Sequence, residues 1–247
     1  MLKQKIIEGG CEREGFYEAV AGVGRMGAII SYIARTIGAK GLNKEALPDD
    51  HKVKSYLFQE EREQLKLLRQ LPAFEQKSVS LLYPGCGADI LFPLFYLEQL
   101  FPKLEQAQLT LIDRHHPAAV IKTVLDDVGV SLAEVSYVES ANVARENDTT
   151  IRFYWKKSLM TIHFREANIF EILNQLPSFD FYFERAFRIM KNGHSQYERK
   201  IVEKLMPGGL VVSDSGFLNL PLTYYPIPPQ LSVYGEMVVG KKEKEKK

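Results

Sequence analysis

A glycine-rich turn follows a short apolar run near residue 80 of this 247-residue chain. The run spans residues 79–83, and the turn contains Pro84, Gly85, Cys86, Gly87 and Asp89. Glycine allows a backbone to approach a ligand closely and to turn sharply into a following helix. The turn therefore suits a ligand site. It suits equally a plain strand-to-helix connection in which Asp89 caps the helix.

A carboxylate ends the next apolar run. Residues 109–112 form that run, and Asp113 follows it, 28 positions after Gly85. An acid at the end of a buried strand can accept hydrogen bonds from both hydroxyls of a ribose. The alternative is a solvated loop acid without a ligand.

A third group of polar residues follows the alternating run at residues 160–164. Asn168 can hydrogen-bond the edge of an adenine, and Ile169 can pack against its ring. The simpler interpretation is that Asn168 caps a helix that begins there.

Strands and helices must alternate to bring these groups together. Short apolar runs predict strands at residues 79–83, 109–112, 179–183, 210–213 and 231–239, and the runs at 151–155 and 160–164 suit a hairpin. Helices are expected at residues 89–101, 117–128, 169–176 and 195–206. This alternation predicts a mostly parallel sheet with helices on both faces. Ligands bind beyond the carboxyl ends of the strands in such a sheet.

Residues 1–75 read as a helical N-terminal segment. Apolar residues recur with a spacing of three and four over residues 16–37, and a second helix is expected at 56–71, ended by Pro72. We therefore divide the chain into a helical segment or lid (1–75), an α/β core (76–241) and a charged tail (242–247).

The composition narrows the class of protein. Lysine and arginine number 32 against 31 aspartates and glutamates, so no nucleic-acid partner is expected. Two cysteines suggest neither a disulfide framework nor a metal site. No segment reads as a signal peptide or membrane span, so we expect a soluble, cytoplasmic protein that does not bind membranes. The sequence leaves the oligomeric state open.

Five segments, in order along the chain, resemble the motifs of class I S-adenosylmethionine-dependent methyltransferases. They are residues 82–87, 111–113, 179–183, 205–213 and 234–241. The resemblance implies a Rossmann-like α/β sheet of seven mostly parallel strands and S-adenosylmethionine as cofactor. It also implies which residues bind that cofactor: Pro84, Gly85, Cys86, Gly87, Asp89, Asp113, Arg114, Asn168 and Ile169.

Two positions depart from the family pattern. Tyr83 stands where the family usually has an acid in its first strand, and Asp89 stands where its third glycine usually lies. S-adenosylmethionine carries a positive sulfonium and a positive ammonium. We therefore hypothesise that Asp89 supplies the negative charge that position 83 lacks.

Polar residues after the run at 179–183 are expected to face the methyl acceptor, because methyltransferases often place substrate contacts there. Glu184 and His194 are candidate general bases. Candidate substrate contacts are Arg185, Asn192, Tyr197 and Tyr17. An ordinary surface role is the alternative for each. A helical cover over the site favours a small-molecule acceptor.

Two other functions stay open. A catalytically inactive methyltransferase-like binding module is favoured by the departures at positions 83 and 89. An NAD-dependent enzyme is suggested by the G-x-G-x-x-G pattern at residues 22–27. That pattern requires a buried strand before it, whereas the preceding residues continue a helical period. Close helix packing is the favoured explanation of these glycines.

Overall fold

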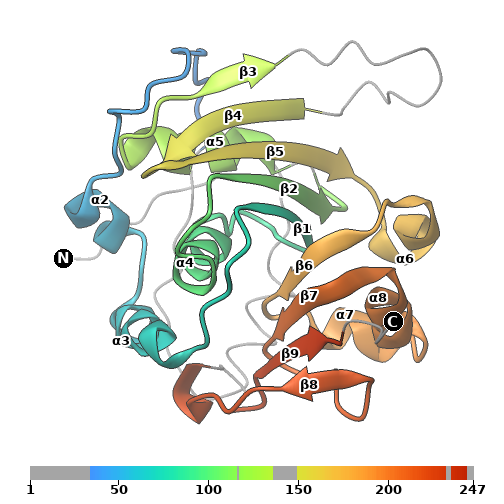
Figure 1. The fold of residues 1–247 in the computed structure, drawn as a ribbon. Coiled ribbons are helices and arrows are strands. Elements are labelled where there is room, and N and C mark those ends of the chain that lie inside the picture. The colour runs from blue at the N-terminus through green and yellow to red at the C-terminus, as the bar shows by residue number, and fades with distance from the viewer. Residues whose placement is uncertain (1–33, 116, 136–148, 232–234, 244–247) are drawn as a thin grey trace.

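The computed structural model describes residues 34–115, 117–135, 149–231 and 235–243. Within these ranges the chain forms one sheet with helices on both faces (Figure 1). The glycine pattern at 22–27 and most of the expected helix at 16–37 lie outside the described residues. Residues 34–37, the end of that expected helix, have no helical structure.

The sheet contains nine strands in the described part of the chain, in the order β3-β4-β5-β2-β1-β6-β7-β9-β8. Most of these strands are apolar runs, as expected where helices cover both faces of a parallel sheet. Their bounds are β1 Ser78–Pro84, β2 Gln106–Asp113, β3 Ala133–Val135, β4 Thr149–Trp155, β5 Ser158–Glu166, β6 Phe179–Glu184, β7 Leu205–Ser213, β8 Leu222–Tyr224 and β9 Val238–Lys242.

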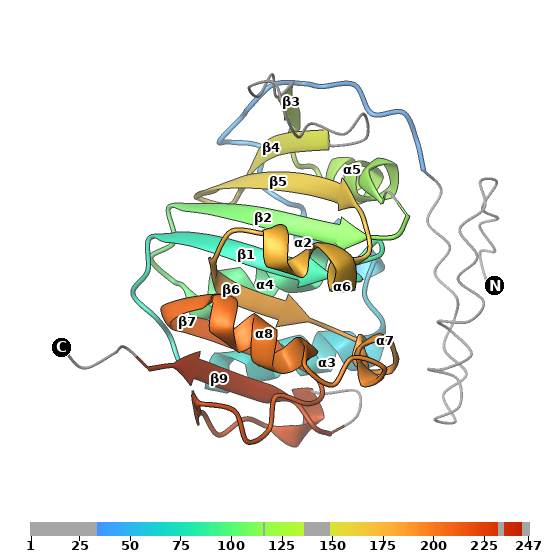
Figure 2. The same cartoon turned by 90° about the vertical axis from the view of Figure 1, so that its right-hand side faces the viewer.

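Five adjacent strands run parallel, in the order β5-β2-β1-β6-β7. Along the chain these are the third, second, first, fourth and fifth parallel strands, which is the order of a doubly wound sheet. Figure 2 shows the arrowheads of β5, β2, β1 and β6, which mark the carboxyl ends of these strands, on the same side of the sheet. The strand order reverses between β1 and β6, and ligands of such sheets bind at this switch point.

The expected Rossmann-like α/β architecture is present, but the prediction of seven mostly parallel strands was wrong. Strand β4 pairs antiparallel with β5, β3 with β4, β9 with β7 and β8 with β9. The β4–β5 hairpin was predicted and is confirmed, with Lys156 at φ +52° in its turn. Strands β3 and β8 have only three residues each, too few for a sequence pattern to indicate.

Helices cover the two faces in separate groups. Along β1, Leu81 and Tyr83 belong to the core shared with α2, α4 and α5, whereas Leu82 belongs to the core shared with α6 and α8 (Figure 1). The bounds are α2 Asp50–Ser55, α3 Gln59–Leu67, α4 Leu91–Leu100, α5 Ala118–Asp127, α6 Ile169–Ile172, α7 Arg188–Asn192 and α8 Tyr197–Lys204, with 3-10 turns η1 Leu68–Gln70, η2 Leu173–Gln175 and η3 Pro229–Leu231.

The segment Pro207-Gly208-Gly209, which falls between the expected helix at 195–206 and the expected strand at 210–213, lies inside β7. The register between β6 and β7 shifts there, between Phe179 and Phe181. A Cβ on Gly209 would lie 2.7 Å from the backbone oxygen of Asp180. Glycine therefore allows the two backbones to pass closely where the pairing is irregular. Of the expected closing strand at 231–239, residues 238–239 lie in β9, whereas residues 231 and 235–237 lie outside strands.

Candidate functional site

The glycine turn and the second-strand carboxylate meet at the switch point. Gly85 and Gly87 both adopt positive φ, +61° and +50°. The Gly87 N–H donates to Asp113 Oδ2 at 2.9 Å, and the Gly85 N–H donates to the Ile112 oxygen at 2.7 Å. The turn is thus bonded to the end of β2, as the parallel arrangement predicted.

The Asp113 carboxylate has acceptor capacity beyond these loop contacts. Its Oδ1 accepts from the His115 N–H at 3.1 Å, and its Oδ2 accepts from Gly87. An ionised carboxylate offers about four lone-pair sites. Asp113 is half-buried, so it is reachable from solvent. The carboxylate can therefore accept hydrogen bonds from the two hydroxyls of a ribose.

An aromatic ring of the chain packs directly on Gly85. A Cβ at Gly85 would lie 2.6 Å from Cδ2 and Cε2 of Phe187, and the Phe187 ring is buried. In this structure, the close approach that glycine permits at Gly85 serves the Phe187 side chain. Phe187 precedes α7, which follows the carboxyl end of β6.

Asn168 caps α6, which is the simpler of its two interpretations. Its Oδ1 accepts from the Phe170 N–H at 3.2 Å, and its Nδ2 donates to Glu171 at 2.8 Å. Ile169 is buried in the core beneath α6. Among the other predicted cofactor residues, Pro84 and Cys86 are buried and Arg114 is exposed. Their assignment to a cofactor stays a prediction.

Asp89 belongs to a cluster of polar and charged side chains at the start of α4. The Tyr83 hydroxyl donates to Asp89 Oδ2 at 2.9 Å, and Arg185 Nη1 lies 3.8 Å from the same oxygen. Arg185 also donates to Glu61 at 2.8 Å and lies over the ring of Phe92. Burial raises the pKa of Asp89, and the charge of Arg185 acts against that rise. The two unusual positions, 83 and 89, are therefore hydrogen-bonded to each other.

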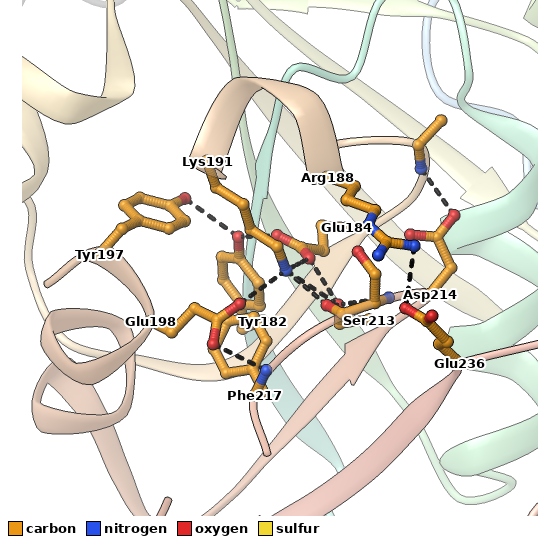
Figure 3. Close-up of polar contacts among 12 residues, drawn as sticks. Tyr182, Glu184, Arg188, Lys191, Tyr197, Glu198, Ser213, Asp214, Phe217 and Glu236 are labelled. Carbon is orange, nitrogen blue, oxygen red and sulfur yellow. Dashed lines mark hydrogen bonds and ion pairs between the residues drawn. The ribbon is translucent and has the colours of Figure 1, made fainter. Parts of the chain in front are cut away.

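A buried polar network lies at the ends of β6 and β7 (Figure 3). Glu184 accepts from the Tyr182 hydroxyl at 2.5 Å, from Ser213 and from Lys191. Lys191 also pairs with Glu198 at 3.1 Å. Burial raises the pKa of Glu184, and the ammonium of Lys191 acts against it. The network joins α7 and α8 to the sheet.

The predicted acceptor-side residues other than Arg185 and Tyr17 divide into a buried and an exposed group. Glu184 and Tyr197 are buried in this network, where Tyr197 lies 3.0 Å from the Tyr182 hydroxyl. His194 and Asn192 are exposed, and the His194 ring stacks on Phe170 with 3.6 Å between centroids. Tyr17 lies outside the described residues. The roles assigned to these residues stay predictions.

A pocket lies between α3, α4 and the ends of β6 and β7. Its lining residues are Gln64, Leu65, Leu68, Phe92, Tyr96, Phe183, Glu184, Arg185, Val212, Asp214, Leu231 and Met237. Sequence reasoning missed Asp214, which is 6% exposed and accepts from the Ala186 N–H at 2.7 Å. The signal existed, because Asp214 follows the β7 apolar run as Asp113 follows that of β2.

The described residues contain neither a metal-binding cluster nor a membrane-spanning helix. No group of three or more His, Cys, Asp and Glu side chains there could hold a metal ion. No helix in the same ranges has the length and apolar character needed to cross a membrane.

No protein-family model matches this sequence, and no curated protein matches it. Solved structures do match, S-adenosylmethionine-dependent methyltransferases among them. TrmN from Thermus thermophilus has 14% identity and a TM-score of 0.40, over 74% of this chain and 48% of its own. A Listeria monocytogenes protein assigned to the class I methyltransferases has 12% identity and a TM-score of 0.39, over 95% and 68%.

A methyltransferase from Silicibacter pomeroyi has 12% identity and a TM-score of 0.34, over 73% of this chain and 88% of its own. This chain spans less than half the length of TrmN. Likenesses this distant do not carry an argument about activity.

Proposed function

We propose that this protein transfers a methyl group from S-adenosylmethionine to a small-molecule acceptor. The observation that carries the proposal is the contact between the Gly87 N–H and Asp113 at the switch point of a doubly wound sheet. A glycine turn after the first strand and an acid ending the second are the features that bind an adenosine in such sheets. The balanced charge of the chain favours a small molecule over a nucleic acid.

Asp113 would hold the ribose, and the Gly85–Gly87 turn would pass beside it. Bound S-adenosylmethionine supplies a methyl group that is already activated. The protein then has to align the acceptor with that group and exclude water. The buried ends of β6 and β7, next to the switch point, suit that task.

The charge around Asp89 suits a cationic cofactor. Asp89 and Glu61 share one guanidinium, that of Arg185, so this group carries one more negative than positive charge. The side chain of Asp89 remains 23% exposed. In this proposal the carboxylate of Asp89 attracts the positive charge of the cofactor, and Arg185 offsets part of that attraction.

Binding of S-adenosylhomocysteine, the demethylated product, tests the proposal by isothermal titration calorimetry. Asp113→Ala should weaken binding by about tenfold or more, because a hydrogen bond to a charged group contributes about 1.5–3 kcal/mol. Glu166→Gln is the matched control, since Glu166 pairs in register with Asp113 at the end of β5. No binding by the unmodified protein, or equal binding by Asp113→Ala, would contradict the proposal.

A binding module without turnover is the second candidate. Two of the predicted cofactor positions are contacted by side chains of the protein itself. The Phe187 ring lies on Gly85, and Asp89 pairs with Tyr83 and Arg185, which favours a module without turnover. Binding of S-adenosylhomocysteine without methyl transfer to any compound of an acceptor panel would support this candidate. A response to NAD alone would instead support the NAD-dependent alternative.

A further inference from the structure

The open face of Gly85, where the missing side chain leaves room, is filled by two side chains of the protein itself. A Cβ on Gly85 would lie 2.6 Å from Cδ2 and Cε2 of Phe187 and 3.5 Å from the methyl carbon of Met190. Glycine in such a turn gives room for the close approach of a ligand. The ring and a ligand cannot fill the same room, so a ligand that uses this face of the turn has to displace Phe187.

Other aromatic rings enclose Phe187, which is 2% exposed. Its ring is stacked on Phe170 with 5.8 Å between centroids, and the Tyr197 ring lies 5.9 Å away. Phe170 belongs to α6, and its other neighbour is the His194 ring, stacked at 3.6 Å. Close-packed rings leave little space for a side chain to change its rotamer in place. The Phe187 ring therefore leaves Gly85 only if its backbone moves.

The backbone of Phe187 leads into α7, a helix that is lightly held. Lys191 is the only one of its five residues that is buried. Ile189 is 62% exposed and Met190 is 38% exposed. Elements with few buried apolar contacts open locally while the rest of the fold stays intact. Helix α7 can therefore move without unfolding of the sheet.

Polar contacts hold α7 at both ends. Before the helix, the Ala186 N–H donates to Asp214 at 2.7 Å, and Ala186 has φ +56°, a conformation that persists in a residue other than glycine only where its surroundings impose it. Near the other end, Lys191 points into the network of Glu184 and Glu198 (Figure 3). Because Ala186 can relax to negative φ once its contact opens, it is the residue that can absorb a change in the direction of the chain.

We propose that Phe187 and α7 close the cofactor site of the free protein and that S-adenosylmethionine binds only after they move off Gly85. The inference rests on the proposed function and adds a regulation of the same site. The apparent affinity for the cofactor is then lower than the intrinsic affinity, by the fraction of molecules that are open. Removal of the Phe187 ring should strengthen binding, whereas removal of a side chain that contacts the cofactor would weaken it.

Isothermal titration calorimetry with S-adenosylhomocysteine tests this reversal of sign. Phe187→Ala should bind about tenfold tighter than the unmodified protein, because the contacts of one buried ring no longer oppose binding. Phe187→Leu, which leaves a smaller cavity, should also bind tighter and replaces Phe187→Ala if that variant folds poorly. Phe101→Ala is the matched control, because Phe101 is equally buried, at the end of α4 far from the glycine turn. It should bind as the unmodified protein does.

Hydrogen–deuterium exchange of the unmodified protein tests the movement without any variant. The amide of Ala186 is bonded to Asp214, and that of Lys191 donates to the Phe187 oxygen at 3.2 Å. Both bonds are expected to open when α7 moves. The peptide that covers residues 186–194 should therefore exchange faster with saturating S-adenosylhomocysteine than without it, although a bound ligand ordinarily slows exchange. The peptide that covers α4 serves as reference.

Unchanged or weaker binding by Phe187→Ala and Phe187→Leu would overturn the inference, as would slower exchange of residues 186–194 in the complex. Weaker binding would make Phe187 part of the cofactor site, and unchanged binding would make it a packing residue alone. If the unmodified protein binds S-adenosylhomocysteine and the Phe187 variants bind no tighter, only the closing role of Phe187 fails. If the unmodified protein does not bind it, the proposed function fails, and this inference fails with it.

Discussion

At the scale of single residues, Lys191 is the cation that compensates the most deeply buried carboxylate in the described part of the chain. Its ammonium contacts Glu184, Glu198 and the oxygen of Ser215. Removal of one partner of a buried pair leaves an uncompensated charge, which costs about 3–5 kcal/mol. Lys191→Met should therefore lower the free energy of unfolding by about this amount, measured by urea denaturation.

The control is Lys66→Met, because Lys66 is 68% exposed in its pair with Glu63. An exposed pair contributes about 0–1 kcal/mol, so this variant should stay close to the unmodified protein. Equal stability of the two variants would show that the network is hydrated and contributes little.

The stability of Lys191→Met should also depend on pH, and the burial of Glu184 sets the sign of that dependence. Burial raises the pKa of Glu184 above its ordinary 4.5, and Lys191→Met removes the cation that opposes the rise. A raised pKa in the folded state means that the fold favours the protonated form. The contribution of Glu184 to the stability of Lys191→Met should thus be greatest below pH 4.5 and fall as the pH rises through the folded pKa.

Urea denaturation at several pH values checks this expectation. Glu184→Gln added to Lys191→Met removes the titrating group, so the double variant should lose that part of the slope. A slope that survives in the double variant would assign the pH dependence to another group.

At the scale of elements, the irregular pairing of β6 and β7 depends on Gly209. A Cβ there would meet the Asp180 oxygen at 2.7 Å, and backbone cannot move aside as a flexible side chain can. Gly209→Ala should destabilise the fold by about 1–3 kcal/mol, the usual cost of overpacking, measured by urea denaturation.

Gly193 provides the matched control for this substitution. It has φ −77° at the end of α7, and a Cβ there would meet nothing within 4 Å. Gly193→Ala should leave the stability within about 0.5 kcal/mol of the unmodified protein. A large loss for Gly193→Ala, or none for Gly209→Ala, would contradict the explanation of the close strand approach.

At the scale of the whole molecule, the nine strands form one continuous sheet, from β3 at one edge to β8 at the other. Trp155, the only tryptophan of the chain, ends β4 near one edge and is buried. If the sheet unfolds as one unit, urea transitions followed by Trp155 fluorescence and by far-ultraviolet circular dichroism should coincide. An earlier fluorescence transition would show that the β3–β5 edge unfolds separately.

Helices and strands that depend on residues close together in the sequence could be predicted. The five parallel strands were expected at the apolar runs that form them, and the hairpin at Lys156 was expected from two alternating runs. The two edge strands β3 and β8 were not expected, because each has only three residues with little apolar patterning. The pairing of Gly87 with Asp113 was also expected, since parallel strands place their carboxyl ends together.

Local periodicity and turn chemistry specify the alternation of strands and helices and the positions of the glycine turn and Asp113. The surroundings of these groups depend on long-range packing. Phe187 lies on Gly85, Lys191 pairs with Glu184, and Asp214 bonds Ala186 at the edge of a pocket. These contacts join different strand ends and helices, and their geometry depends on how the helices pack on the sheet, which no local pattern in the chain records.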